Sequence, residues 1–225
     1  MSKVKEDLPL KLLRVIYYGL DFNKLTAFFC YTLSRWLMGF TFGFPQEYHF
    51  LMTNFCNLRC IFCNQKTDNE PKGEITFERF EIMASHINTA LVKSFVLSGG
   101  GEPLLSRDLF RIIEYVNSQF PWIKITIITN GLLIGKYAEN LANLNILQLI
   151  ISIHGAGEEG DFIVQKKGSV PEVFKGIEIL NKSLERSQRK IRKGFYCVVS
   201  QLNISSVPEL IIKAAELKVD EIYVN

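Results

Sequence analysis

The chain has 225 residues, of which 48% are hydrophobic, and its 26 basic and 23 acidic side chains give a formal net charge of +3. This is enough for one sizeable buried core and too little for two ordinary domains with linkers. Nucleic acid is a poor partner for such balanced charge, because the only dense basic stretch, Arg186 to Lys193, falls between an expected helix and an expected strand. We expect that stretch to be a solvated helix end and turn rather than a phosphate-binding patch.

Residues 1–45 differ in amino-acid composition and pattern from the rest of the chain. Leu, Ile, Tyr, Phe and Trp alternate there with Lys and Arg before a Gly/Phe-rich exit, Gly39 to Pro45. We predict one or two amphipathic helices and a linker that cover an edge of a sheet, in preference to peripheral docking on a membrane or a partner. Neither a signal peptide nor about twenty uninterrupted apolar residues can be found, so we expect a cytoplasmic location.

From residue 46 to residue 225 the sequence alternates between short apolar runs and longer segments of helical period. Such alternation is typical of βα units around a parallel sheet, with strands buried on both faces. The expected strands are Tyr48 to Thr53, Ser94 to Ser98, Lys124 to Thr129, Leu147 to Ile153, Gly194 to Ser200 and Glu221 to Asn225. The expected helices would bury the stripes Phe80, Met83, Ile87 and Leu91; Leu109, Ile112, Ile113 and Val116; Val173, Ile177, Leu180 and Leu184; and Leu210, Ile211 and Ala214.

Two of the expected helices open with the same four-residue pattern. Ser169-Val-Pro-Glu172 and Ser206-Val-Pro-Glu209 each place a glutamate three residues after a serine, with a proline between them. This is the spacing of a capping box with proline in the first turn. We predict that both serines cap helices and have no catalytic role.

Polar and small residues gather where the expected strands end. In a parallel βα array the carboxyl ends of the strands face one mouth, so these residues should converge. The segments are Asn54 to Asn64, Ser98 to Pro103, Thr129 to Gly131, Ser152 to Gly155, Ser200 to Asn203, and Asn225. One mouth would then collect thiols, backbone amides, a carboxylate, side-chain amides and an imidazole.

The first of these segments carries three of the five cysteines, Cys56, Cys60 and Cys63. An odd number of cysteines, three of them crowded together, indicates a cofactor rather than a disulfide framework, and Cys30 and Cys197 suit small buried side chains. Three thiolates can bind a four-iron cluster and leave one iron open to another ligand. The alternative is structural zinc, whose fourth ligand would come from a distant residue. The candidates for it are His49, His86, His154 and Cys197.

The second segment places three consecutive glycines, Gly99 to Gly101, before Glu102 and Pro103. Backbone without side chains lets a ligand approach closely, and Glu102 could then take an ammonium group. Alone, the same residues could form only a tight turn that ends the strand.

Together the two motifs resemble those of the radical S-adenosylmethionine (SAM) superfamily. The resemblance covers about residues 47–225, and it is carried by Cys56-x-x-x-Cys60-x-Phe62-Cys63 and, one βα unit later, Gly100-Gly101-Glu102-Pro103. It implies an α/β fold, a partial (β/α)6 TIM-like barrel preceded by the N-terminal amphipathic helical segment. It also implies a [4Fe-4S] cluster and SAM as cofactors.

The resemblance assigns roles to ten residues. Cys56, Cys60 and Cys63 would hold the catalytic cluster, and Gly100, Gly101 and Glu102 would hold the methionyl amine of SAM. Asn130, Ser152 and His154 would contact its ribose or carboxylate, and Phe62 would lie near the adenine. Asn130 could instead be only a turn residue before Gly131, and Ser152 only a small strand residue.

The implied reaction is reductive cleavage of SAM to methionine and a 5′-deoxyadenosyl radical, which takes a hydrogen atom from an unidentified substrate. An electron donor such as flavodoxin or ferredoxin would be a partner. The SPASM-type subgroup, many of whose members modify peptides or proteins, is also similar, but beyond Cys63 this chain has only Cys197. Since the chain ends in a strand, we expect a fragment of a longer protein rather than an end covered by a partner.

Two other classes of function remain open on the sequence. A non-catalytic iron–sulfur module for electron transfer or sensing would bind a cluster without needing Glu102 and its glycines. A zinc-stabilised α/β binding module would be colourless, whereas a four-iron cluster is brown.

Overall fold

The structure is a computed structural model that describes residue 29, residues 45–63 and residues 73–225. The chain divides into two compact units, Met1–Pro45 and Gln46–Asn225. The helices expected within residues 1–45 fall almost wholly outside the described residues, as does Cys30, and they stay predictions. The second unit contains the segment in which βα units are expected.

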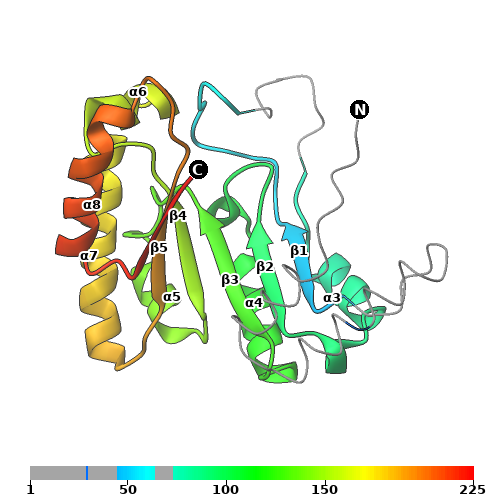
Figure 1. Cartoon of the computed structure of the whole chain (residues 1–225). Coiled ribbons are helices and arrows are strands. Elements are labelled where there is room, and N and C mark those ends of the chain that lie inside the picture. The colour runs from blue at the N-terminus through cyan, green and yellow to red at the C-terminus, as the bar shows by residue number, and fades with distance from the viewer. Residues whose placement is uncertain (1–28, 30–44, 64–72) are drawn as a thin grey trace. The chain divides into compact units, whose positions relative to one another are not determined.

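Six parallel strands form one sheet in the order β1-β2-β3-β4-β5-β6, which is also their order in the chain. Figure 1 shows them side by side, with helices packed along the sheet. The strands are β1 (Glu47–Leu51), β2 (Ser94–Ser98), β3 (Lys124–Thr129), β4 (Gln148–Ser152), β5 (Arg192–Cys197) and β6 (Glu221–Val224). The helices are α3 (Phe77–Ser85), α4 (Leu109–Gln119), α5 (Ala138–Asn143), α6 (Glu158–Val164), α7 (Ser169–Ser187) and α8 (Val207–Glu216), with 3-10 turns η1 (Thr89–Leu91), η2 (Pro103–Leu105) and η3 (Ile204–Ser206). The predicted α/β fold built on a parallel sheet is confirmed.

Strand β5 begins two residues earlier than predicted and ends three residues sooner. Arg192 and Lys193 pair with Gln148 and Leu149 of β4, although their side chains are charged. Ladder pairing uses backbone groups, so a charged residue can join a strand that an apolar pattern would exclude. This extension places Lys193 inside the sheet.

The helices bury their predicted stripes on the sheet, with two exceptions. All four apolar residues predicted for α4 and all four for α7 are buried. Helix α3 ends at Ser85, before Ile87 and Leu91, and its Met83 is exposed. The residues after Ser85 include Ile87, Asn88 and Thr89, all weak helix formers, which accounts for the early end. On α8, Ile211 is 49% exposed.

The two predicted capping boxes are wrong. Helix α7 is preceded by Gly168 in a left-handed conformation, and Ser169 is already its first residue. The Ser206 side chain does not cap α8, because its hydroxyl donates to the Asn203 carbonyl over 3.0 Å. In both cases the serine hydroxyl donates a hydrogen bond to another polar group, so the sequence spacing alone did not predict the cap correctly.

No helix in the described part of the chain is long and apolar enough to cross a membrane.

Candidate active site

Residues Asn54 to Cys63, here called the cysteine loop, are joined by backbone hydrogen bonds to two other segments. On one side, the Glu102 amide donates to the Phe55 carbonyl over 2.7 Å, and the Gly101 amide donates over 2.9 Å to the carbonyl of Thr53, the residue before the loop. On the other side, the Ile61 amide donates to the Ile163 carbonyl of α6 over 2.9 Å. The loop is therefore anchored to the end of β2 and to the last turn of α6.

The glycines that follow β2 permit this close approach. A Cβ atom on Gly101 would lie 2.0 Å from the Phe55 carbonyl oxygen, and one on Gly99 would lie 2.8 Å from that of Thr53. Real Cβ atoms do not come so close to backbone, so a side chain at either position would displace the loop. Gly100 is half-buried in the same turn. The triple glycine thus has a positioning role that does not depend on a bound ligand.

Glu102 is 1% exposed, and its carboxylate accepts three hydrogen bonds from within the chain. One oxygen accepts from the Leu104 amide over 2.9 Å and from the Thr129 hydroxyl over 2.6 Å, and the other accepts from the Asn130 amide over 2.7 Å. Burial raises the pKa of Glu102, while these hydrogen bonds oppose that rise. In this arrangement the side chain joins the ends of β2 and β3 and is not presented to a ligand.

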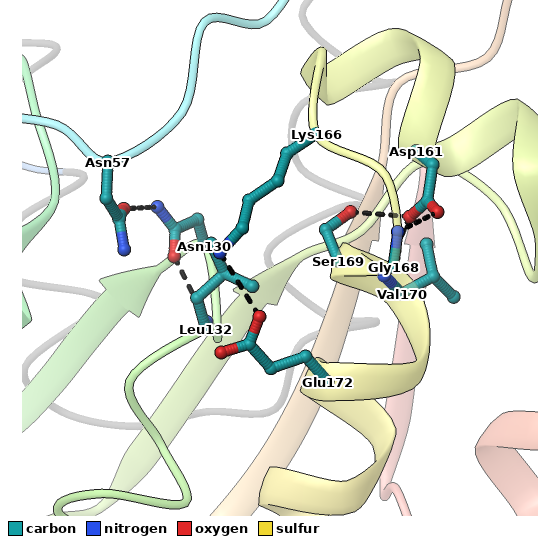
Figure 2. A network of polar contacts seen from close by, with 9 residues as sticks. All are labelled: Asn57, Asn130, Leu132, Asp161, Lys166, Gly168, Ser169, Val170 and Glu172. Carbon is teal, nitrogen blue, oxygen red and sulfur yellow. Dashed lines mark hydrogen bonds and ion pairs between the residues drawn. The ribbon is translucent and has the colours of Figure 1, made fainter.

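Asn130 connects the end of β3 to the cysteine loop (Figure 2). Its Nδ2 donates to the Asn57 side-chain oxygen over 2.7 Å, and lies 3.9 Å from the Cys56 sulfur. Its own side-chain oxygen accepts from the Leu132 amide over 3.1 Å. The turn role expected as an alternative is therefore present, together with a contact to the loop.

The three cysteines occupy one short stretch of this anchored loop. Cys56 is exposed, Cys60 and Cys63 are half-buried, and none is in a disulfide. The Cys56 sulfur is nonetheless partly shielded, and this burial raises the pKa of its thiol, as do the charges of Glu102 and Cys63. Among the described residues no three His, Cys, Asp or Glu side chains stand close enough together to hold a metal ion.

The three cysteines are suitable ligands for a four-iron cluster with one open iron, both in their chemistry and in their place on one anchored loop. Soft thiolates are the ligands such clusters take, and all three sit on a loop fixed at both ends. Cys197, the other described cysteine, is buried in β5 and its sulfur lies 3.8 Å from the Asn203 amide nitrogen. It is therefore placed for packing, as predicted, and not as a fourth ligand.

Phe62 and His154 meet although they are far apart in the sequence. Their rings pack edge to face with centroids 4.8 Å apart, and Phe62 remains 46% exposed. Phe62 lies between the last two cysteines, while His154 follows β4. This contact joins the loop to a third strand end, and leaves part of the Phe62 ring available to a ligand.

His154 is 4% exposed and is held as a neutral imidazole. Burial lowers its pKa to about 4, and its Nδ1 accepts a hydrogen bond from the Val198 amide over 3.3 Å. The proton of the neutral ring is therefore on Nε2. The fully buried Asn203 donates to the His154 carbonyl over 2.8 Å and to the Val198 carbonyl over 2.9 Å, which fixes the ends of β4 and β5 together.

A small pocket brings three of the predicted SAM-binding residues together. Asn130, Ser152 and His154 all line it, and Leu58 of the cysteine loop lies on its wall. Ser152 is half-buried at the end of β4. The structure thus gathers at one mouth the ends of β3 and β4 and the cysteine loop.

The sequence reasoning missed Asp161, which organises the wall of this mouth (Figure 2). Its carboxylate accepts from the Ser169 hydroxyl over 2.6 Å, from the Val170 amide over 2.9 Å and from the Gly168 amide. Burial raises the pKa of Asp161, but these hydrogen bonds outweigh it and leave the pKa below its usual value. Asp161 therefore caps α7 from α6, the helix that anchors the cysteine loop. An acidic residue seven positions before a glycine gave no recognisable signal.

The other ligands considered for zinc lie in separate surroundings. His49 is exposed and pairs with Glu47 over 2.9 Å. His86 is exposed, and its Nδ1 lies 2.7 Å from the Ile82 carbonyl of its own helix. Each is thus engaged locally.

Comparison with known proteins places the chain in a family. Residues 50–220 match the model of the radical SAM superfamily. A protein of Archaeoglobus fulgidus named "Probable GTP 3',8-cyclase" is 35% identical over 127 residues, which are 56% of this chain and 42% of that protein. A protein of the same name from Methanococcus maripaludis is 30% identical over 164 residues, or 70% of this chain and 52% of that protein. The chain spans about half the length of the curated relatives it matches.

Solved structures share the fold. Streptococcus suis SuiB bound to S-adenosylmethionine aligns with a TM-score of 0.67 and 21% identity over 80% of this chain and 40% of that one. A structure of anSMEcpe with bound AdoMet aligns with a TM-score of 0.64 and 21% identity over 80% of this chain and 49% of its own. The predicted partial TIM-like barrel is thereby confirmed. The chain belongs to the radical SAM superfamily, whose enzymes use a [4Fe-4S] cluster and S-adenosylmethionine.

Proposed function

We propose that this chain is the core that cleaves SAM reductively, with Cys56, Cys60 and Cys63 as the cluster ligands. When bound, the cluster supplies one electron that breaks the sulfonium–C5′ bond of SAM, giving methionine and a 5′-deoxyadenosyl radical for hydrogen abstraction. The observation that carries the proposal is the attachment of the cysteine loop to three strand ends. The loop meets Glu102 after β2, Asn130 after β3 and His154 after β4.

The chain's own residues divide the remaining tasks. We assign the backbone of Gly100 and Gly101 to the methionyl amine, because the Glu102 carboxylate is already taken by three donors. Its buried negative charge still favours a nearby ammonium group. Asn130, Ser152 and the Nε2–H of His154 lie together at this mouth, where we assign them contacts to the ribose or the carboxylate. The exposed face of Phe62 would pack on the adenine.

For the substrate we put GTP first, because the relatives from Archaeoglobus fulgidus and Methanococcus maripaludis are named for an activity on it and are 30% or more identical. The peptide or protein substrate expected from the sequence is the second candidate. The likeness to SuiB bound to its precursor peptide, with 20% identity, supports the fold and not that substrate. A flavodoxin or ferredoxin would supply the electron.

The first test is anaerobic reconstitution with iron and sulfide, reduction with dithionite, addition of SAM and chromatography for 5′-deoxyadenosine. We expect product from the wild type and none from Cys60→Ala. Addition of GTP should then raise the yield of 5′-deoxyadenosine if it is the substrate. A brown wild-type protein that leaves SAM intact would favour the electron-transfer module and contradict the proposal.

A further inference from the structure

A second cavity, of about 500 Å³ and open to solvent, lies at the opposite end of the sheet from the cysteine loop. It is bounded by the last turns of α7, the first residues of β5 and the turn between α8 and β6. Its volume is within the range of small-molecule sites. Its lining carries five cationic side chains: Arg189, Lys190, Arg192, Lys193 and Lys218.

The carboxylates at this cavity neutralise only part of that charge. Glu185 pairs with Lys218 over 3.3 Å, and Glu221 pairs with Arg192. One oxygen of Asp220 accepts the backbone amide of Lys193 over 2.7 Å. Within the described part of the chain, Arg189, Lys190 and Lys193 form no ion pair. The cavity therefore has an excess of positive charge.

Lys193 is the unusual member of this set, since the residue as a whole is 7% exposed. It lies two residues before Phe195, on the same face of β5, and Phe195 stacks on Phe174 of α7 with ring centroids 6.4 Å apart. Its side chain accordingly starts on the face of the sheet that α7 covers. Among the described residues nothing hydrogen-bonds to it, and burial lowers its pKa, although the charge of Asp220 opposes this. A buried ammonium that makes no hydrogen bond is costly to a fold.

The end of helix α7 explains the presence of Arg189 and Lys190 at the cavity, but not that of Lys193. Helix α7 ends at Ser187, and cations such as Arg189 and Lys190 are favourable beside the carbonyl end of a helix. Lys193 belongs to a strand, where a Val or Ile would pack at this position without cost. A negatively charged ligand would explain why a lysine stands at this buried strand position, which the helix end does not explain.

Against the expectation from the sequence for Arg186 to Lys193, we propose that this cavity binds the phosphate group of a small molecule, with Lys193 as the buried contact and Arg189 and Lys190 as the outer ones. A compact dianion offers several acceptor oxygens to ammonium and guanidinium donors. Nucleic acid would instead require a basic stripe along the surface. The site goes beyond the proposed SAM cleavage, because it lies at the other end of the strands.

The test is titration calorimetry of the full 225-residue chain with inorganic phosphate, in chloride buffer of matched ionic strength. We expect saturable binding by the wild type, weakened about tenfold or more in Lys193→Met, which removes a charge-assisted contact. Lys182→Met, an exposed lysine of α7 outside the cavity, should bind like the wild type. Lys193→Met should fold, because it replaces a buried charge with an apolar chain of similar length.

Arg189→Gln provides a second variant at an exposed position of the cavity, and should weaken binding by a smaller factor. No saturation with phosphate, or equal losses in Lys193→Met and Lys182→Met, would overturn the proposal. So would displacement of phosphate by a single-stranded oligonucleotide at lower concentrations than by pyrophosphate, which would assign the patch to nucleic acid. All these readouts are independent of SAM cleavage.

Discussion

Glu102 and Lys193 are both charged residues buried on the sheet, and they lie at its opposite ends. The Glu102 carboxylate accepts three hydrogen bonds and links two strand ends to the base of the cysteine loop. Among the described residues, the Lys193 ammonium has no such partner and faces a cavity with excess positive charge. A buried charge that is fully hydrogen-bonded holds structure together, whereas one without partners costs stability. We therefore interpret Glu102 as a structural residue and Lys193 as an indication that a ligand binds beside it.

The same contrast extends to the neighbours of each residue. At the carboxyl ends of the strands, Asn130, His154 and Asn203 each make contacts between segments. Contacts within the chain thus hold these residues in place, and such preorganisation lowers the cost of binding a ligand. Substitutions at both ends of the sheet test this contrast directly.

The largest effect should come from Gly101→Ala. The added Cβ would lie 2.0 Å from the Phe55 carbonyl oxygen, so the turn and the cysteine loop must separate. We expect a loss of about 3 kcal/mol in the free energy of unfolding and less iron bound per chain after reconstitution. Denaturant titration and iron analysis measure the two. Gly73→Ala is the control, since nothing lies within 4 Å of its added Cβ; equal behaviour of the two variants would refute the anchoring role.

Glu102→Gln tests the buried carboxylate itself. The new amide group must point a donor at one of three existing donors, so we expect a loss of about 2 kcal/mol in unfolding free energy. Glu114→Gln, an exposed change on α4, should cost almost nothing. If Glu102→Gln kept full stability but lost affinity for SAM, the carboxylate would be a ligand contact, as the sequence motif predicts.

His154 should make stability depend on pH. Its folded pKa of about 4 lies below the ordinary value of 6.5, so below pH 6.5 the unfolded chain takes up a proton that the folded chain refuses. Stability is then complete above pH 6.5, and we expect a loss of about 2 kcal/mol between pH 7 and pH 5. Denaturant titrations at both values should show this loss in the wild type and in the control His49→Gln. A loss of the same size in His154→Gln would contradict the assignment.

Lys193→Met should have the smallest effect and the opposite sign. Removing the buried charge should raise the free energy of unfolding by about 1 kcal/mol in chloride buffer, where Glu102→Gln lowers it. Thermal unfolding of the two variants side by side measures the contrast directly. A destabilised Lys193→Met would mean that the ammonium stabilises the fold without a ligand.

The sequence predicted best the two strands that consist of a short, mainly apolar run with a polar residue at each end. The bounds of β2 and β3 match the expected runs residue for residue. The start of β5 was missed because Arg192 and Lys193 are charged, although their backbone groups pair normally. An apolar pattern reports which side chains are buried and not which amides are paired.

The candidate site was predicted as a set of residues, but not as a set of contacts. Because the carboxyl ends of parallel strands face one mouth, the sequence predicted that the cysteine loop would lie there with Asn130, Ser152 and His154. The engagement of Glu102 by Thr129 and Asn130 depends on the register of β2 against β3, which no local pattern encodes. Asp161 was missed for the same reason, because its partners lie across a turn between two helices.

The central claim is that the cysteine loop holds a four-iron cluster whose open iron binds SAM. Electron paramagnetic resonance of the reconstituted chain, reduced anaerobically with dithionite, tests it most directly when spectra are recorded before and after SAM is added. We expect a reduced-cluster signal whose g values change with SAM, and no such signal in Cys60→Ala. A spectrum that SAM leaves unchanged, or a colourless chain that carries zinc, would contradict it.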